Sequence, residues 1–225
     1  MCDTCHAELA RLSALPACPH CGRTLPSPAI HENRCARCRP EHFWNLAAII
    51  RLAPYEPVIR TPILHLKYAG HDRNADFLAT LLADALRPHD WPPTLAALVP
   101  IPMHRLRRLQ RPCDHSLALA RALAKRLNLK VCRALKRTKQ SPSQTHFQTR
   151  HQRFQNVKNC FAATSAADAL RGRTVCLVDN LIVSGATICE AAKTLHRIGV
   201  RRIYAAVLAR PPAPGDPPAN LPPSP

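Results

Sequence analysis

TVCLVDNLIVSGATICE, residues 174–190, is the stretch of the sequence that decides the fold. Its apolar run, residues 175–178, is typical of a strand buried on both faces of a sheet. The strand is expected to end at Asp179-Asn180. After a short loop, a helical pattern begins near Ala186 and runs to about Arg197. A buried strand followed directly by a helix predicts an α/β fold with a parallel sheet.

The turn between this strand and helix, Ser184-Gly185-Ala186-Thr187, has the composition of a phosphate-binding loop. Backbone N–H groups of such a turn converge on one point, where the helix dipole adds partial positive charge. Gly185 allows the backbone to approach an anion closely, and Ser184 and Thr187 offer hydroxyl donors. Asp179 could accept hydrogen bonds from sugar hydroxyls beside the phosphate. An ordinary strand-to-helix turn is the alternative, but the apolar strand and Asp179 favour a phosphate site.

The chain is long enough for one main domain with a core plus a small module, since it has 225 residues. Its charge is lopsided, with 32 Lys and Arg against 14 Asp and Glu, for a net charge of +18. Residues 101–160 alone hold fifteen basic residues and a single acid, Asp114. Such a field attracts polyanions, either nucleic acid or a multiply charged phosphate ester. The alternative is a basic surface with no specific partner.

Six of the eleven cysteines form three C-x-x-C pairs within residues 1–40. Two pairs joined by a short loop supply the four thiolates of a tetrahedral zinc site. Three pairs leave one over, and the tight CPHCG turn of the second pair favours the set Cys18, Cys21, Cys35 and Cys38. No signal peptide precedes the pairs and no apolar run has the length of a membrane span. We therefore expect a cytoplasmic protein with structural Zn(II) rather than a disulfide scaffold.

The remaining pair, Cys2 and Cys5, is expected to be half of a second ribbon whose other half is missing upstream of Met1. His6 and His20 are alternative ligands, although thiolates nearby favour cysteine. A thioredoxin-like redox pair is the weaker interpretation, because no βαβ pattern lies beside it.

The rest of the chain alternates strand and helix patterns, which supports the parallel sheet. We expect strands within 45–55, 95–99, 131–135 and 201–209, helices over 57–68, 72–86 and 116–127, and a mobile loop with a short helix over 136–160. The last fifteen residues contain eight prolines and are expected to be disordered. The predicted organisation is a zinc ribbon over 1–42, a main domain over 43–210 and a Pro-rich tail over 211–225.

With these parts in order, the chain resembles the ComF (competence protein F-like) family. That family has a type I phosphoribosyltransferase fold and is linked to DNA uptake. The matching features after the cysteine pairs are Tyr55, Leu66-Lys67-Tyr68, Pro100-Ile101-Pro102, a basic arm, Gln144, Arg153, Asn156, Phe161 and the loop at Ser184. Asn180 stands where the family usually has a second acidic residue, and Val183 where it has a hydroxyl. Arg111-Pro112-Cys113-Asp114-His115 stands in place of Arg-Gly-Phe-Asn-Gln.

The resemblance implies a phosphoribosyltransferase-type parallel sheet flanked by helices and a site for 5-phosphoribosyl 1-pyrophosphate (PRPP). That site would consist of Asp179, Asn180, Ser184, Gly185, Ala186, Thr187, Lys67 and Arg153, with Mg(II) accompanying PRPP if the protein is active. No side chain is assigned as catalytic.

The function expected is binding of PRPP or a related phosphate-ribose ligand, together with single-stranded DNA, during DNA uptake. A competence helicase or another protein is expected as a further partner. The alternatives are an active phosphoribosyltransferase acting on a base or small nucleophile, and a non-catalytic scaffold that binds a protein through its zinc module.

Overall fold

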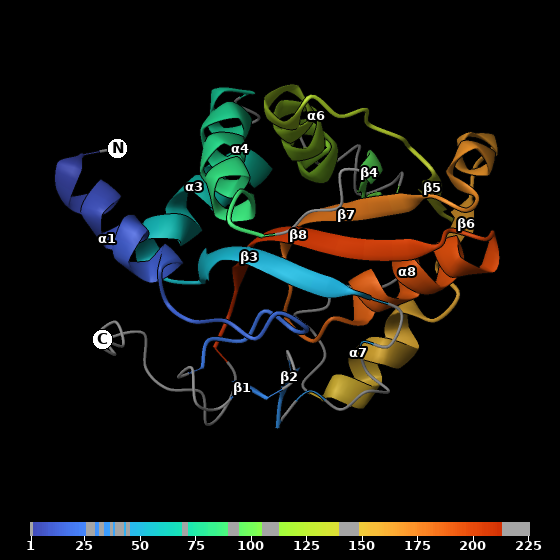
Figure 1. Cartoon of the computed structure of the whole chain (residues 1–225), viewed down its shortest axis with the longest axis horizontal. Coiled ribbons are helices and arrows are strands. Elements are labelled where there is room, and N and C mark those ends of the chain that lie inside the picture. Colours follow the sequence, from blue (N-terminus) through green and yellow to red (C-terminus); the bar gives the residue numbers. More distant parts are fainter. Residues whose placement is uncertain are drawn as a thin grey trace.

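Four parallel strands form the central sheet, in the order β3-β8-β7-β4 (Figure 1). Their bounds are Ala48–Pro54 for β3, Leu95–Pro100 for β4, Thr174–Leu181 for β7 and Arg202–Arg210 for β8. The structure is a computed structural model, and it describes residues 2–25, 30–31, 34–36, 38, 43, 46–68, 72–89, 95–104, 113–139 and 149–212.

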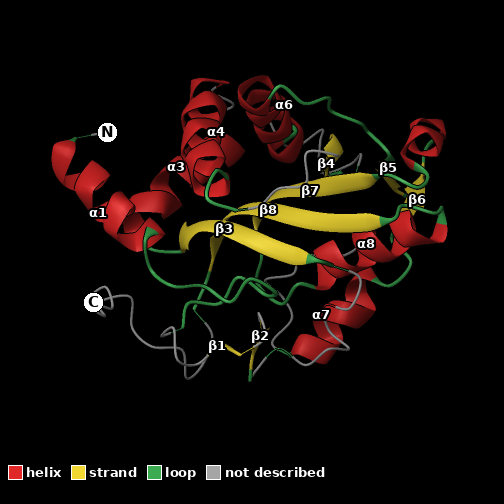
Figure 2. Ribbon diagram, in the orientation of Figure 1, coloured by secondary structure: helices red, strands yellow, loops and turns green. Residues whose placement is uncertain are grey.

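Both faces of the sheet are covered, which explains why its strands read as apolar runs (Figure 2). Successive residues of β7 alternate between the two cores: Val175 and Leu177 belong to one, and Cys176 and Val178 to the other. All four are completely buried.

The first core is closed by α1 (Asp3–Ser13), α3 (Pro57–Tyr68), α4 (Asp72–Leu86) and α6 (His115–Leu127). The apolar stripe expected on α3, Ile59, Ile63 and Leu66, is fully buried against the sheet. The predicted bounds of α3 and α4 agree with the structure. Asp114 caps α6 by accepting a hydrogen bond from the Leu117 N–H at 3.3 Å, so α6 begins one residue before the predicted start.

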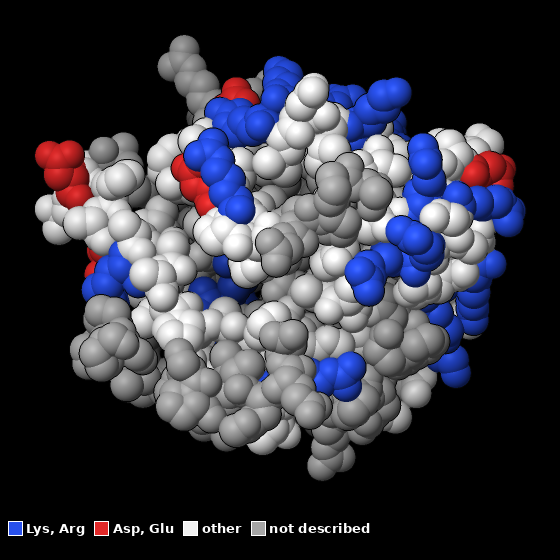
Figure 3. Space-filling model, viewed as in Figure 1, with Lys and Arg blue, Asp and Glu red and all other residues white. Residues whose placement is uncertain are grey.

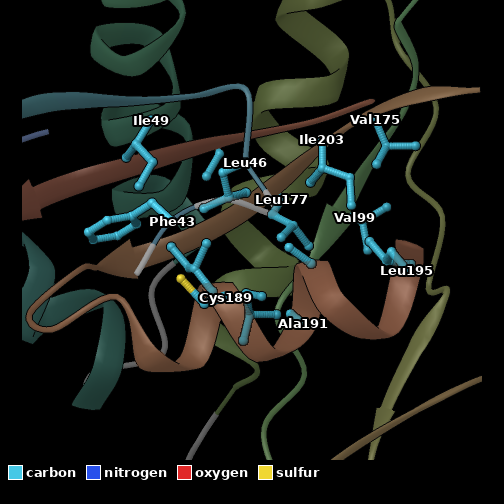
Figure 4. Packing of buried hydrophobic residues seen from close by; sticks show 14 of the residues in the cluster. Phe43, Leu46, Ile49, Val99, Val175, Leu177, Cys189, Ala191, Leu195 and Ile203 are labelled. Carbon is cyan, nitrogen blue, oxygen red and sulfur yellow. The ribbon is translucent and has the colours of Figure 1, made fainter. Parts of the chain in front are cut away.

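The second core lies under α8 (Ala186–Arg197) and α7 (Arg150–Val157). It also holds the short antiparallel pair β5 (Leu135–Arg137) and β6 (Phe161–Ala163), the 3-10 helix η3 (Ser165–Leu170), and the cysteine segment with β1 (Ile30–His31) and β2 (Arg34–Cys35). Phe43 and Ile49 meet Cys189 of α8 and Leu177 of β7 in this core (Figure 4). The cysteine segment therefore packs directly onto the main sheet.

Three sequence-based expectations need correction. The strand predicted over 131–135 is wrong: Val131 makes one isolated bridge with Leu98, and the strand begins at Leu135. β7 continues to Leu181, so Asp179 and Asn180 lie within it rather than at its end. Cys2 precedes the first turn of α1 and Cys5 lies within it, both exposed, so the pair predicted to be half of a second ribbon is the start of a helix.

Some expectations fall on residues outside the described ranges. These are Gln144, the basic arm before Cys113 and the tail beyond Pro212. Within the described ranges, no helix has the length and apolar character needed to span a bilayer.

Candidate ligand pocket and metal centre

A pocket of about 320 Å³ lies where β4 and β7 end and α8 begins. This is the edge at which parallel α/β sheets hold their ligands. The residues that line it are Lys67, Tyr68, Ile101, Pro102, Met103, His115, Ser116, Arg137 and the continuous run 179–188.

The loop between β7 and α8 has the geometry of an anion-binding turn. Gly185 adopts a left-handed conformation with φ of 84° and is the N-cap of α8. Ser184 Oγ accepts a hydrogen bond from the Ala186 N–H at 3.3 Å. The first N–H groups of a helix have no partner within it and carry partial positive charge. A phosphate group placed in this part of the pocket would receive those donors.

Gly185 is also needed for packing, because Phe43 lies against its Cα. A Cβ at position 185 would come within 2.7 Å of Phe43 Cζ, far inside van der Waals contact. Phe43 is 2% exposed. Its ring meets the edge of His20 at a centroid distance of 5.8 Å, and the Arg150 guanidinium lies 5.4 Å from its centroid. The phosphate loop therefore rests on an aromatic side chain that the cysteine segment holds in place.

Asp179 is the carboxylate at the floor of the pocket. Its Oδ1 accepts hydrogen bonds from Ser116 Oγ at 3.1 Å and from the Asn180 N–H at 2.8 Å. Burial raises the pKa of Asp179 above its usual range, although those two donors and the positive charges of Lys67 and Arg137 oppose the shift. The pocket thus holds the Asp179 carboxylate in place, although burial disfavours its ionised form.

Asn180 is 1% exposed and also lines the pocket. Neither its Nδ2 nor its Oδ1 has a hydrogen-bond partner among the described residues. Buried amides are almost always paired, so this one is available to a ligand that both donates and accepts. A sugar hydroxyl has that property.

The structure brings most of the predicted ligand-binding residues together. Lys67, Asp179, Asn180 and the four residues of the turn 184–187 all line the pocket. Arg153 lies on α7 and is not among the described lining residues.

Arg137 supplies a cation to the pocket, and sequence analysis missed it because β5 has only three residues and no periodicity. Ser116 was missed as well. The cap at Asp114 could have identified it, since a helix start after a strand end faces the same edge of the sheet.

The four favoured cysteines form one cluster. Cys18, Cys21, Cys35 and Cys38 are buried, and their sulfur atoms lie within 4.8 Å of one another. The Cys18–Cys38 and Cys21–Cys35 distances, 3.5 and 3.9 Å, are close to the edge of about 3.8 Å of a tetrahedron with Zn–S bonds of about 2.3 Å. The cluster could therefore hold a zinc ion.

Two buried arginines attach this cluster to the sheet. Arg51 of β3 donates to the Gly22 carbonyl at 2.9 Å and to Thr24 Oγ1 at 2.9 Å, and Arg210 of β8 donates to the Cys21 carbonyl. Burial, followed by the nearby Arg210 charge, lowers the pKa of Arg51 to about 10, so Arg51 stays protonated at neutral pH. The C-x-x-C turn is thereby attached to β3 and to the carboxyl end of β8.

Comparison with known proteins places these features in context. A family model described as "Phosphoribosyl transferase domain" matches residues 112–222. "Competence protein F" of Haemophilus influenzae is 28% identical over 93% of this chain and 90% of its own length. "DNA utilization protein YhgH" of Escherichia coli K12 is 29% identical over 86% of this chain and 83% of its own length.

Among solved structures, TT1426 from Thermus thermophilus is 16% identical with a TM-score of 0.36, covering 64% of this chain and 86% of that chain. The predicted fold class is confirmed by the helix-flanked parallel sheet, the matched domain and the four-cysteine cluster.

Proposed function

We propose that the chain binds a phosphoribosyl ligand and single-stranded DNA in DNA uptake, because it is similar to competence protein F and the YhgH DNA utilization proteins and matches a phosphoribosyl transferase domain over residues 112–222. The ligand site is the pocket between β4, β7 and α8. The observation that carries this proposal is the continuous lining run 179–188, which joins a carboxylate, an unpaired buried amide and a helix N-terminus in one cavity.

The ligand's 5-phosphate would occupy the turn 184–187, where backbone N–H groups, Ser184 and Thr187 can donate to it. Its ribose hydroxyls would meet Asp179, which accepts, and Asn180, which both donates and accepts. A pyrophosphate group would extend toward Ile101 and Lys67.

Lys67 and Arg137 would offset the negative charge of that pyrophosphate, since both line the pocket. Arg137 would thus be the arginine of the ligand site, in place of Arg153, which the sequence resemblance implied.

Mg(II) is the ion that the fold family implies with PRPP. Asp179 is the single carboxylate among the described lining residues, and its Oδ1 already accepts two hydrogen bonds. Mg(II) prefers carboxylate oxygens and water in octahedral geometry, and Asn180 replaces the second acid. This donor set does not fit a protein-held Mg(II), so no part of the proposal depends on that ion.

Turnover of PRPP is the second candidate function, favoured by the match to the transferase domain. Lys67 and Arg137 could stabilise a departing pyrophosphate electrostatically, without a general base. Pyrophosphate release from PRPP in the presence of candidate bases measures this directly, with Asp179→Ala as the control.

Calorimetric titration tests the proposal itself, with PRPP and ribose 5-phosphate as separate ligands. We expect both to bind, and Thr187→Val to weaken both by about tenfold, the loss of one hydrogen bond to a charged group at about 1.5 kcal/mol. The matched control is Thr80→Val on the exposed surface of α4. No heat with either ligand would leave the scaffold function, in which the zinc module binds a protein partner.

A further inference from the structure

Arginines gather at the edge of the sheet opposite the pocket, where β7 and β8 begin. Arg171 and Arg173 lead into β7, and Arg197, Arg201 and Arg202 end α8 and lead into β8. All five side chains are exposed. The space-filling model has basic side chains along its right-hand margin, the side on which β5 and β6 lie in the same view (Figure 1 and Figure 3).

Hydrogen bonds hold the two arginine-bearing turns side by side. The Arg201 N–H donates to the Arg173 carbonyl at 2.9 Å, and the Gly172 N–H donates to the Gly199 carbonyl at 2.7 Å. The Arg171 Cγ lies 4.0 Å from the position of a Cβ on Gly199. The backbone of the two turns therefore keeps Arg171, Arg173, Arg201 and Arg202 close together in space.

One acid lies with this group: Asp168 pairs with Arg171 at 3.1 Å. With five arginines against this one aspartate, the group keeps a strongly positive net charge. Guanidinium groups bind phosphate oxygens in a bidentate manner, and five of them can bind several phosphates of one chain rather than a single anion.

We propose that these five residues, here called the arginine edge, hold the phosphate backbone of single-stranded DNA. This inference rests on the proposed DNA-binding function and names its surface. The five side chains offer guanidinium groups and no aromatic ring for base stacking, so binding should not depend on base sequence.

The arginine edge and the pocket are separate sites. The eight residues of β7 rise about 3.3 Å each, which puts the two ends of the strand roughly 26 Å apart. DNA on the arginine edge therefore leaves the pocket open to its own ligand.

The experiment measures fluorescence anisotropy of a labelled oligothymidylate of about 20 nucleotides, longer than the roughly 4–16 nucleotides that single-strand binding folds cover. The variant is R171Q/R173Q/R201Q/R202Q, titrated at several salt concentrations. Each phosphate contact to a single strand contributes roughly 0.7 to the slope of log K against log salt, so the slope should fall by roughly 2.8.

The matched control removes four other exposed charges, R60Q/R87Q/R121Q/K125Q, from α3, the end of α4 and α6. We expect it to keep nearly the wild-type salt slope. An equal loss of DNA affinity and salt slope in both variants would mean that DNA responds to the overall positive charge of the protein, and this would overturn the proposal. Unchanged DNA binding by the first variant would also overturn it.

The outcome for the pocket is read independently by PRPP calorimetry on the same proteins. If wild-type protein binds PRPP but no DNA, the DNA-binding part of the proposed function fails and the arginine edge fails with it. If DNA binds through the arginine edge while PRPP does not bind, only the pocket proposal fails.

Discussion

The two ends of β8 carry the same residue type in opposite environments. Arg210, at the carboxyl end, is 4% exposed and donates to the Cys21 carbonyl. Arg202, at the amino end, is exposed beside Arg201. Desolvating a guanidinium is expensive unless hydrogen-bond acceptors compensate it, and the cysteine segment supplies the Cys21 carbonyl to Arg210. Arg210 is therefore structural, whereas Arg201 and Arg202 keep their charge available to a partner.

The same contrast holds for glycine. Gly185 and Gly172 both have positive φ, 84° and 69°, and they lie at opposite ends of β7. A Cβ on Gly172 would meet nothing within 4 Å, whereas one on Gly185 would overlap Phe43. The loop at the carboxyl end of β7 thus depends on packing as well as on backbone conformation, whereas the turn at the amino end depends on backbone conformation.

Loss of the metal cluster should produce the largest effect. Cys35→Ser removes one of four buried thiolates, and we expect it to abolish zinc binding and lower the free energy of unfolding by about 4 kcal/mol or more. PRPP binding should be lost with it, because Phe43 would no longer be held against Gly185. Metal content by mass spectrometry, chemical denaturation and PRPP calorimetry measure the three effects.

The exposed cysteines provide the control for that variant. Cys2→Ser/Cys5→Ser should keep zinc, stability and PRPP binding, because both thiols lie outside the cluster. DNA binding by Cys35→Ser, measured below its lowered Tm, should stay close to wild type. Parallel loss of DNA and PRPP binding would show that the two edges are not independent.

The two glycines give the next largest effect. Gly172→Ala should cost about 1–2 kcal/mol, the strain of a non-glycine residue in the left-handed region. Gly185→Ala should cost roughly 1–3 kcal/mol more, because its methyl group overpacks against Phe43. Denaturant unfolding measures both.

A double-mutant cycle tests the cause of that difference. Phe43→Ala is itself destabilising, but in the Gly185→Ala background it should cost less than alone, since it removes the overlap. Strict additivity would mean that Phe43 does not constrain the loop.

Local sequence patterns predicted α3, α4, α6 and α8 and the chemistry of the loop, whereas α1 and the contacts between distant segments were not predicted. The α3 stripe of Ile59, Ile63 and Leu66 has a 3.6-residue period that one face of a helix must bury, so it was readable in advance. The loop from Ser184 to Thr187 could also be predicted from the sequence, because the residues that form a turn and a helix start are neighbours in the chain.

The contact of Phe43 with Gly185 joins residues far apart in the sequence, and no local pattern encodes it. Arg137 enters the pocket because β5 pairs with β6, a three-residue ladder without a period of its own. The domain boundary after residue 42 remains a prediction, and the cysteine cluster shares a core with Ile49 and Leu177 beyond it.

Asn180→Asp tests whether the pocket binds PRPP without the help of Mg(II), and its expected effect on affinity is smaller than the effects above. A second carboxylate beside Asp179 adds like-charge repulsion that a divalent cation can relieve. We expect Mg(II) to change the PRPP affinity of wild type by less than about threefold and that of the variant by about tenfold, or roughly 1.4 kcal/mol. Calorimetry with EDTA or Mg(II) measures it, and strong Mg(II) dependence of wild type would contradict the assignment.

Asp179→Asn should give the smallest change in stability, with a size that depends on pH. The pKa of Asp179 is raised in the folded state, so folding retains its proton and the wild-type protein loses stability as pH rises through that value. Asparagine can still accept from Ser116 Oγ without carrying charge. The variant should therefore melt a few degrees above wild type at neutral pH, with the difference vanishing below the ordinary aspartate pKa of about 3.9. PRPP binding should weaken at the same time, which would show that the carboxylate is kept for its ligand at the expense of stability. A variant that is less stable than wild type at neutral pH would instead assign the carboxylate to holding Ser116 and the start of α6.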